Sequence, residues 1–253
     1  KGEAGLDAGG LTRDMFTQIY KELHNPNIGL FIPVPNARNK IGGFQDCFIP
    51  SPDSELPDQY EKYWTVGVLL AIGVRTGIVQ AYSFPNLFWD VLAGKQITES
   101  HLFEIDELYK KQIQEYRKIT DPDQFEEQFP DLEQTQDHRG NFVSVTNGQK
   151  VTPENVSWFI SQAHQVRINE LMNPLKIIRD GFWGNLGFSC PEFVTGSLLE
   201  KVCCAEKNIA TEDIKERTNI EPESEKNSEV ITLFWQMVDG FNMEHKQQLL
   251  QFW

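Results

Sequence analysis

Hydrophobic residues recur at helical spacing over most of the chain. From Leu11 to Leu23 they fall at every fourth position, and Asn25-Pro26-Asn27 ends the pattern. Between Asp58 and Thr76 the segment becomes apolar on nearly all sides after Trp64, which predicts a central buried helix. Further amphipathic segments predict helices at 86–93, 100–118, 192–204, 212–217, from Ser228 and from Asn242.

Short apolar runs between turn residues predict two small β regions. The first lies within residues 29–49, around the Gly42-Gly43 pair. The second is Phe142–Val145, followed by Asn147-Gly148, a strong hairpin signal because a type I′ turn needs positive φ at both central residues. The polar, acidic stretch from Thr120 to His138 predicts a mobile loop or a weak edge strand. The expected fold class is therefore α+β, mainly α.

A helix is predicted after the Asn-Gly turn. Thr152 is suited to cap it and Pro153 to occupy its first position, and the helical spacing runs to about Met172. Asn173-Pro174 predicts a break or a kink, after which the helical stripe continues as far as Phe182.

Two large aromatic residues, Trp158 and Phe159, are neighbours in this helix. Adjacent helical residues point about 100° apart, so both rings cannot occupy the centre of one buried face. Either Phe159 is presented to another surface, or Phe159 packs in the core and Trp158 is the exposed ring. The residues alone leave these two interpretations open.

Charge narrows the classes of partner. The chain has 23 Lys and Arg against 37 Asp and Glu, a net charge of −14, which disfavours binding to nucleic acid and to anionic lipid. The longest apolar run, Val66–Val74, is far shorter than the ~20 residues of a membrane span. We therefore expect no nucleic-acid partner and no membrane span.

No self-contained active site is apparent in the sequence. Cys203 and Cys204 lie in an apolar helix, Cys190 precedes a helix, and Cys47 lies in a turn-rich region with a superficially catalytic setting, although a structural role is favoured. The histidines show no metal-ligand spacing, so no metal or other cofactor is expected. The lack of a signal peptide and of disulfide spacing predicts a reducing, cytoplasmic or nuclear setting.

Several collinear stretches resemble one family. They are GLDAGGLTRDMF (5–16), GVLLAIGVRTG (67–77), FPNLFWDVLAGKQIT (84–98), EIDELYK (104–110), VTNGQKVTPEN (145–155), DGF (180–182) and FWQMVDGFNMEHKQQLLQFW (234–253). In this order they resemble the N-lobe of the HECT ubiquitin-ligase domain. Within this family, the stretches GGFQDCF (42–48) and AIGVRTG resemble the large HERC-type ligases in particular.

The resemblance implies a two-part N-lobe: a large helical subdomain, residues 1–103 and 171–253, and a small inserted α/β subdomain, residues 104–170, that docks a ubiquitin-conjugating enzyme. It also implies a C-lobe whose cysteine accepts ubiquitin and passes it to a substrate lysine. That catalytic cysteine is expected beyond Trp253, so none of the four cysteines here is expected to be catalytic. The chain alone is expected to be inactive.

The resemblance further implies a docking groove between residues 105–113 and 153–163. Phe159 matches the family's central groove aromatic, Leu108 and Tyr109 match an apolar contact pair, and Gln112 occupies a position that is often apolar in relatives. The implied partners are a ubiquitin-conjugating enzyme, ubiquitin and protein substrates. The alternatives are a non-catalytic helical scaffold that uses the groove for another protein and, more remotely, a cysteine hydrolase that uses Cys47.

Overall fold

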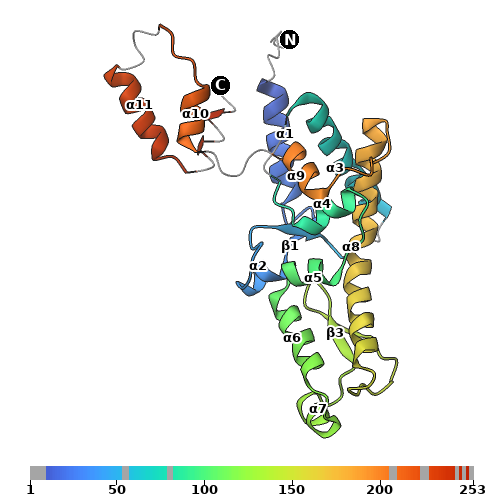
Figure 1. The fold of residues 1–253 in the computed structure, drawn as a ribbon. Helices are drawn as coiled ribbons and strands as arrows, with labels where there is room; N and C mark the ends of the chain where they lie inside the picture. Colours follow the sequence, from blue (N-terminus) through green and yellow to red (C-terminus); the bar gives the residue numbers. More distant parts are fainter. Residues whose placement is uncertain are drawn as a thin grey trace.

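The structure is a computed structural model that describes residues 10–52, 57–78, 82–204, 210–222, 228–242, 245–246 and 249–250 (Figure 1). Its helices are α1 Gly10–Leu23, α2 Pro35–Asn39, α3 Pro57–Thr76, α4 Asn86–Leu92, α5 Glu99–Ile105, α6 Glu107–Lys118, α7 Pro122–Gln128, α8 Val156–Leu186, α9 Gly196–Cys203, α10 Thr211–Arg217 and α11 Glu229–Asp239. Its strands are β1 Phe31–Pro33, β2 Phe48–Pro50, β3 Gln134–Gln136 and β4 Phe142–Ser144. The mainly α, α+β fold class is confirmed.

Helix α8 runs through most of the length of the molecule. Figure 1 shows α3 and α4 beside one half of this helix, with α9 packed against α4, and α5, α6 and β3 beside the other half. Asn173-Pro174 was predicted to break or kink the helix, and the break does not occur: helical geometry continues across Pro174. Proline has no N–H, so the carbonyl of Glu170 loses the usual intrahelical donor four residues later. One helix therefore belongs to both predicted subdomains.

Close backbone contact joins α3 to α8. A Cβ added to Gly67 would overlap the Ile178 carbonyl oxygen and lie 2.7 Å from the Phe182 nitrogen. A Cβ added to Gly181 would overlap the carbonyl oxygen of Trp64 on α3. Both glycines are thus required by packing.

The two predicted β regions each form a two-stranded antiparallel sheet. In the first sheet Ile32 of β1 pairs with Ile49 of β2. In the second, β4 pairs with β3, which precedes it in the chain and lies in the acidic stretch. The hairpin signal had predicted a partner strand after the Asn-Gly turn. Asn147 and Gly148 do have φ values of 50° and 83°, as a type I′ turn requires. The turn was predicted correctly and its strand partner was not.

Three element boundaries also differ from expectation. The segment predicted as one helix from Ser100 to Lys118 is two helices, because the backbone leaves helical geometry at Asp106 (φ −143°, ψ 89°). The acidic stretch contains the short edge strand β3, one of the two alternatives predicted for it, but it also contains the helix α7, capped by Asp121, which was not predicted. Helix α8 begins at Val156, after a turn that includes Pro153, so Thr152 is not its cap.

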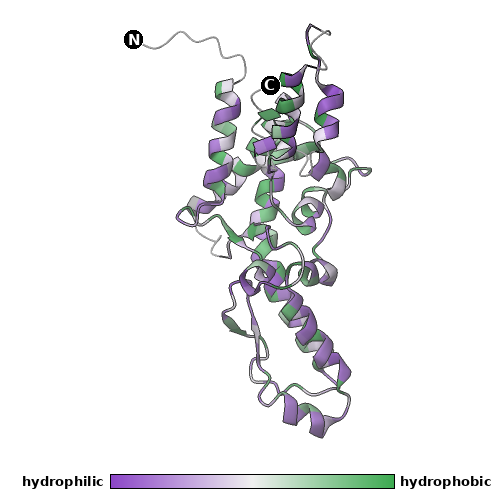
Figure 2. Ribbon diagram, turned by 90° about the vertical axis from the view of Figure 1, so that its left-hand side faces the viewer, coloured by the Kyte–Doolittle hydropathy of each residue, from purple (hydrophilic) through white to green (hydrophobic). Residues whose placement is uncertain are grey.

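Hydropathy differs between the two ends of the molecule. Figure 2 shows hydrophilic residues along much of the lower part, which holds α6 and α7, and more hydrophobic residues in the upper body. Helices α10 and α11 pack against each other and lie to one side of that body in Figure 1. None of the helices in the described ranges is long and apolar enough to span a bilayer. The predicted helix from Asn242 falls largely on residues outside those ranges.

Candidate functional site

The N-terminus of α6 is fixed by its cap. The Asp106 carboxylate accepts a hydrogen bond from the Tyr109 backbone N–H at 3.0 Å, which satisfies one of the free donors of the first turn. Tyr109, Ile113 and Tyr116 recur at helical spacing and are buried. The opposite face of α6 is therefore left to solvent.

Two of the four predicted contact residues lie on that solvent-facing side. Leu108 is 47% exposed, and Gln112, four residues later, is also exposed. The Gln112 amide donates to the Tyr116 hydroxyl at 2.6 Å, which holds the side chain along the helix. We call Leu108 and Gln112 the outer α6 face: one apolar side chain on an otherwise polar helix surface.

The other two predicted residues lie beneath this face. Phe159 is 1% exposed and Tyr109 is 2% exposed. The expectation that Phe159 lies open in a groove is wrong in this structure, and Trp158 is the half-buried ring of the pair. A direct contact of Phe159 or Tyr109 with a partner would require the subdomain core to open.

Phe159 lies at the end of a row of aromatic rings that begins in α7, a helix not predicted from the sequence. Helix α7 supplies Phe125, whose ring packs edge-on against Phe129 at 5.1 Å between centroids. Phe129 packs against Tyr116 at 4.8 Å, and Tyr116 packs against Phe159 at 5.8 Å. Edge-to-face aromatic pairs of this kind stabilise a small core beyond their area burial.

A buried ion pair ties α6 to α8. Arg167 Nη1 donates to Asp106 Oδ2 at 2.8 Å, with both side chains almost wholly buried. The guanidinium carbon lies 3.8 Å from the centre of the Tyr109 ring, a cation–π contact. Asp106 thus holds both the helix start and the arginine of α8.

A second polar chain runs from Tyr109 to the surface. The Tyr109 hydroxyl is 2.7 Å from His164 Nδ1, and His164 Nε2 is 2.7 Å from Glu99 Oε2. Arg117 donates two hydrogen bonds to the Glu99 carboxylate, and these lower the pKa of Glu99 to about 2. The order carboxylate–histidine–hydroxyl is that of a nucleophilic triad, but Tyr109 is 2% exposed, and burial raises the pKa of its phenol. A buried hydroxyl cannot reach a substrate, so these three groups connect α5, α6 and α8 and do not form a nucleophilic site.

This polar cluster was not predicted from the sequence, although the sequence carries two signals of it. Arg167 falls in the buried register Ala163–Arg167–Leu171, where a charged residue requires a buried partner. Asp106 directly precedes an amphipathic run, the position of an N-cap. Neither signal identifies the pairing of the two residues, which depends on the folded arrangement of α6 and α8.

The structure shows no sign of an activated thiol at any of the four cysteines, all of which lie in the described ranges. Cys47 and Cys203 are each 2% exposed. Burial raises the pKa of Cys203 to about 12 and also raises that of Cys190, which is the reverse of what a nucleophile requires. Among the described residues there is also no cluster of three or more His, Cys, Asp or Glu side chains suited to a metal ion.

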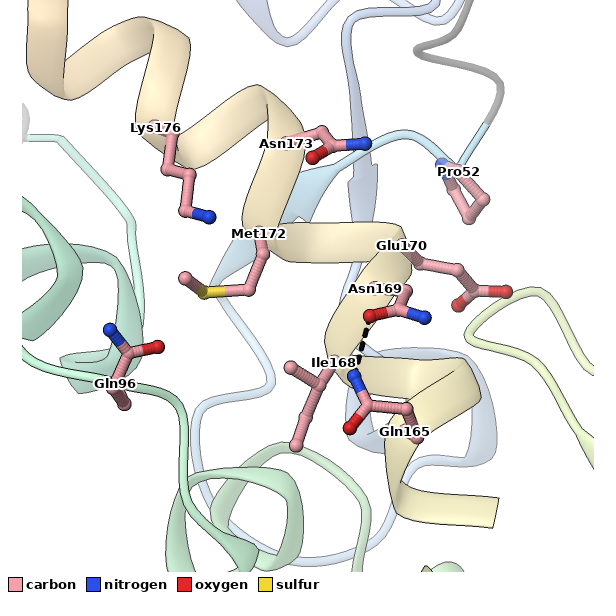
Figure 3. Close-up of a pocket in the computed structure, with 9 residues that line it drawn as sticks. All are labelled: Pro52, Gln96, Gln165, Ile168, Asn169, Glu170, Met172, Asn173 and Lys176. Carbon is pink, nitrogen blue, oxygen red and sulfur yellow. Dashed lines mark hydrogen bonds between the residues drawn. The ribbon is translucent and has the colours of Figure 1, made fainter. Parts of the chain in front are cut away.

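A polar cavity of about 460 Å³ lies against the middle of α8. In Figure 3, Gln96, Met172 and Lys176 lie on one side of the helix and Pro52 and Glu170 on the other. Between them the Gln165 amide donates to Asn169 at 2.6 Å. The remaining lining residues are Ile168 and Asn173. Amide groups, the Lys176 amine and the Glu170 carboxyl line the cavity, so it offers hydrogen bonds and ionisable groups of both signs.

Glu170 in this cavity makes stability depend on pH. Desolvation raises its pKa to about 7, with Asp137 acting in the same direction, while the His138 N–H and the arginines at 139 and 167 act against it. Because the pKa of Glu170 is higher in the folded chain than in the unfolded chain, the protonated carboxyl stabilises the fold. This stabilisation is complete below about pH 4.5 and is lost as pH rises through 7.

Glu170→Gln should therefore gain stability over the parent as pH rises. We expect its advantage in urea unfolding to grow by about 1–2 kcal/mol between pH 5 and pH 8. The exposed Glu127→Gln is the matched control and should show a difference that does not change over this range. If the stability gain of Glu170→Gln over the parent were equally independent of pH, the raised pKa of Glu170 would be contradicted.

Comparison with known proteins identifies the family of this chain. The family model described as "HECT-domain (ubiquitin-transferase)" matches residues 17–253. The chain therefore belongs to the HECT-domain family, and the resemblance seen in the sequence is confirmed.

The relatives are named as ubiquitin ligases. The chain is 26% identical over 99% of its length to the E3 ubiquitin-protein ligase HERC2 of Homo sapiens, and it covers 5% of that protein. It is 24% identical over 99% of its length to the probable E3 ubiquitin-protein ligase HUL4 of Eremothecium gossypii, covering 31% of that protein. It is 28% identical over its full length to the E3 ubiquitin-protein ligase Nedd-4 of Drosophila melanogaster, covering 25%. The chain thus spans less than a third of each of these relatives.

Proposed function

We propose that this chain recruits a ubiquitin-loaded conjugating enzyme for a HECT-type ligase. Ubiquitin would then pass from that enzyme to a cysteine outside the chain, and from there to a lysine of a protein substrate. The observation that carries the proposal is the outer α6 face. There Leu108 is exposed on a helix whose buried side is held by the Asp106–Arg167 ion pair. Membership of the HECT-domain family supports it. A cytoplasmic or nuclear location belongs to the same proposal.

The support beneath α6 suits the helix to docking. The Asp106 cap and the Arg167 ion pair fix the start of the helix, and Tyr109 is held by Arg167 and His164. A binding face that is already ordered loses little conformational entropy when a partner docks. Phe159 therefore contributes by supporting the face and Leu108 by contact, which revises the direct role expected for Phe159.

Leu108→Asp should weaken binding of a conjugating enzyme by about ten- to a hundredfold, because it removes an apolar contact and places a charge in the interface. Calorimetric titration against a panel of ubiquitin-conjugating enzymes measures the change. Gln112→Ala should cost less, because its amide already bonds within the helix.

Leu198→Asp on α9 is the matched control for this titration, since Leu198 is exposed to a similar degree on another helix. It should leave the affinity unchanged, and circular dichroism should show both variants folded. Equal binding by the parent and Leu108→Asp would overturn the proposed face.

The isolated chain should form no thioester with ubiquitin. The chain is incubated with activating enzyme, conjugating enzyme, ATP and ubiquitin and then run on a non-reducing gel. We expect conjugating enzyme loaded with ubiquitin, and no ubiquitin adduct of this chain that a thiol reductant removes. An adduct lost in Cys47→Ser would instead support the cysteine-based alternative.

A further inference from the structure

The short helix α2, between β1 and β2, lies where the large and small subdomains meet (Figure 1). Asn36 on this helix is 1% exposed, and its amide is fully engaged with main-chain groups. Its Nδ2 donates to the Glu104 carbonyl at 2.8 Å and to the Gly43 carbonyl at 2.9 Å, and its Oδ1 accepts from the Glu107 N–H at 2.7 Å. One side chain thus connects the end of α5 to the first residue of α6.

The loop after α2 encloses this contact closely. Gly42 has φ +75°, and a Cβ there would lie 2.8 Å from Asn36 Nδ2 and 3.1 Å from the Glu107 Cβ. A glycine is therefore needed both for the backbone conformation and for the space. The large subdomain is shaped to hold the α5–α6 corner.

A second contact from the same segment reaches the other wall of the small subdomain. Arg38 Nη1 donates to the His138 carbonyl at 3.0 Å, next to the β3–β4 turn. The guanidinium lies over Gly140, where a Cβ would be 3.5 Å from Arg38 Nη2. From the turn itself, Arg139 Nη2 donates back to Ser51 Oγ, just after β2, at 2.6 Å.

These contacts complete a three-point attachment of the small subdomain. By the predicted bounds the small subdomain has two covalent connections to the large one. One is helix α8, which lacks one intrahelical hydrogen bond at Pro174, where a helix bends most readily, and the other is the α5–α6 corner. The hydrogen bonds of Glu99 with His164 and Arg117 also cross between the two parts. Asn36 holds the α5–α6 corner, and Arg38 holds the β3–β4 turn, which has no covalent connection to the large subdomain. Helix α8, the corner and the turn are three separate points, and three such points fix an orientation.

We propose that Asn36 and Arg38 are positioning residues that fix the angle between α6 and the large subdomain. They thereby direct where a conjugating enzyme docked on the outer α6 face presents its ubiquitin. The functional part of this inference rests on the proposed function. The geometric part concerns the chain alone and can be tested without a partner.

The test is a distance distribution between spin labels on the two subdomains of this chain. Labels go on Lys62→Cys in α3 and Glu127→Cys in α7, both exposed positions, with Cys190 and Cys204 replaced by serine. The parent should give one narrow distribution. Asn36→Ala combined with Arg38→Ala should broaden it at least twofold, with affinity for a conjugating enzyme changed by less than about threefold.

A matched control separates positioning from general stability. Tyr63→Phe removes the 2.7 Å hydrogen bond to the Leu30 carbonyl within the large subdomain, and should lower the melting temperature while the distribution stays narrow. An unchanged width in the double variant would overturn the positioning role. If the parent binds no conjugating enzyme but the double variant broadens the distribution, the proposed function fails and the geometric inference stands.

Discussion

Replacing Arg167 by methionine is expected to lower the free energy of unfolding by about 3–5 kcal/mol. The substitution leaves the Asp106 carboxylate buried without its cation, and a buried charge without a partner is strongly destabilising. It also removes the cation above the Tyr109 ring. Urea unfolding followed by circular dichroism measures the loss.

Two variants make this test specific. Asp106→Asn with Arg167→Met removes both charges while keeping a side-chain oxygen that can cap α6, and should recover more than half of the loss. Arg117→Met breaks the exposed pair with Glu99 and should cost less than about 1 kcal/mol. A loss below about 1 kcal/mol for Arg167→Met alone would show that the pair does not hold the subdomain.

Replacing Gly67 by alanine is expected to cost about 3 kcal/mol or more. The added methyl group would meet the backbone of α8 at Ile178 and Phe182, and backbone atoms cannot move aside as a flexible side chain can. For a chain of this size the expected fall in melting temperature is about 6–12 °C. Differential scanning calorimetry measures it.

Gly184→Ala is the matched control for this substitution. Gly184 also lies in a long helix, but a Cβ there would have no neighbour within 4 Å. Alanine has the higher helix propensity, so this variant should be neutral or up to about 1 kcal/mol more stable. If Gly67→Ala proved as stable as Gly184→Ala, the close contact between α3 and α8 would be wrong.

Elements with strong helical periodicity were predicted well from the sequence. The spacing of apolar residues located α1 and α3, and the positive-φ requirement located the Asn147-Gly148 turn. These features depend on local sequence, since a helical stripe or a turn conformation is encoded by residues close together. Distant contacts have little influence on them.

The errors arose where distant groups decide the outcome. A period of 3.6 continues through Asp106, so only its cap and its pairing with Arg167 reveal the change of helix. The acidic composition of the 120–138 stretch hid α7, whose Phe125 is buried by the subdomain core. The burial of Phe159 depends on those same rings, so adjacency to Trp158 could not decide between the two interpretations.

Two of the four predicted contact residues are exposed in the structure. Resemblance to the family pointed to Leu108 and Gln112, which the structure places together on the outer α6 face. The residues beneath and beside that face, including Asn36 and Arg38, were not predicted. Their partners are main-chain atoms of segments far away in the chain, and no sequence pattern specifies such a pairing.

The most direct test of the recruiting role is a nuclear magnetic resonance titration of the isotope-labelled chain with a panel of ubiquitin-conjugating enzymes. Recruitment through the outer α6 face predicts that at least one enzyme shifts the amide signals of residues 107–115, with smaller changes in the first turns of α8 and none in α9 to α11. Shifts confined to α9 to α11, or no binding by any enzyme, would contradict it.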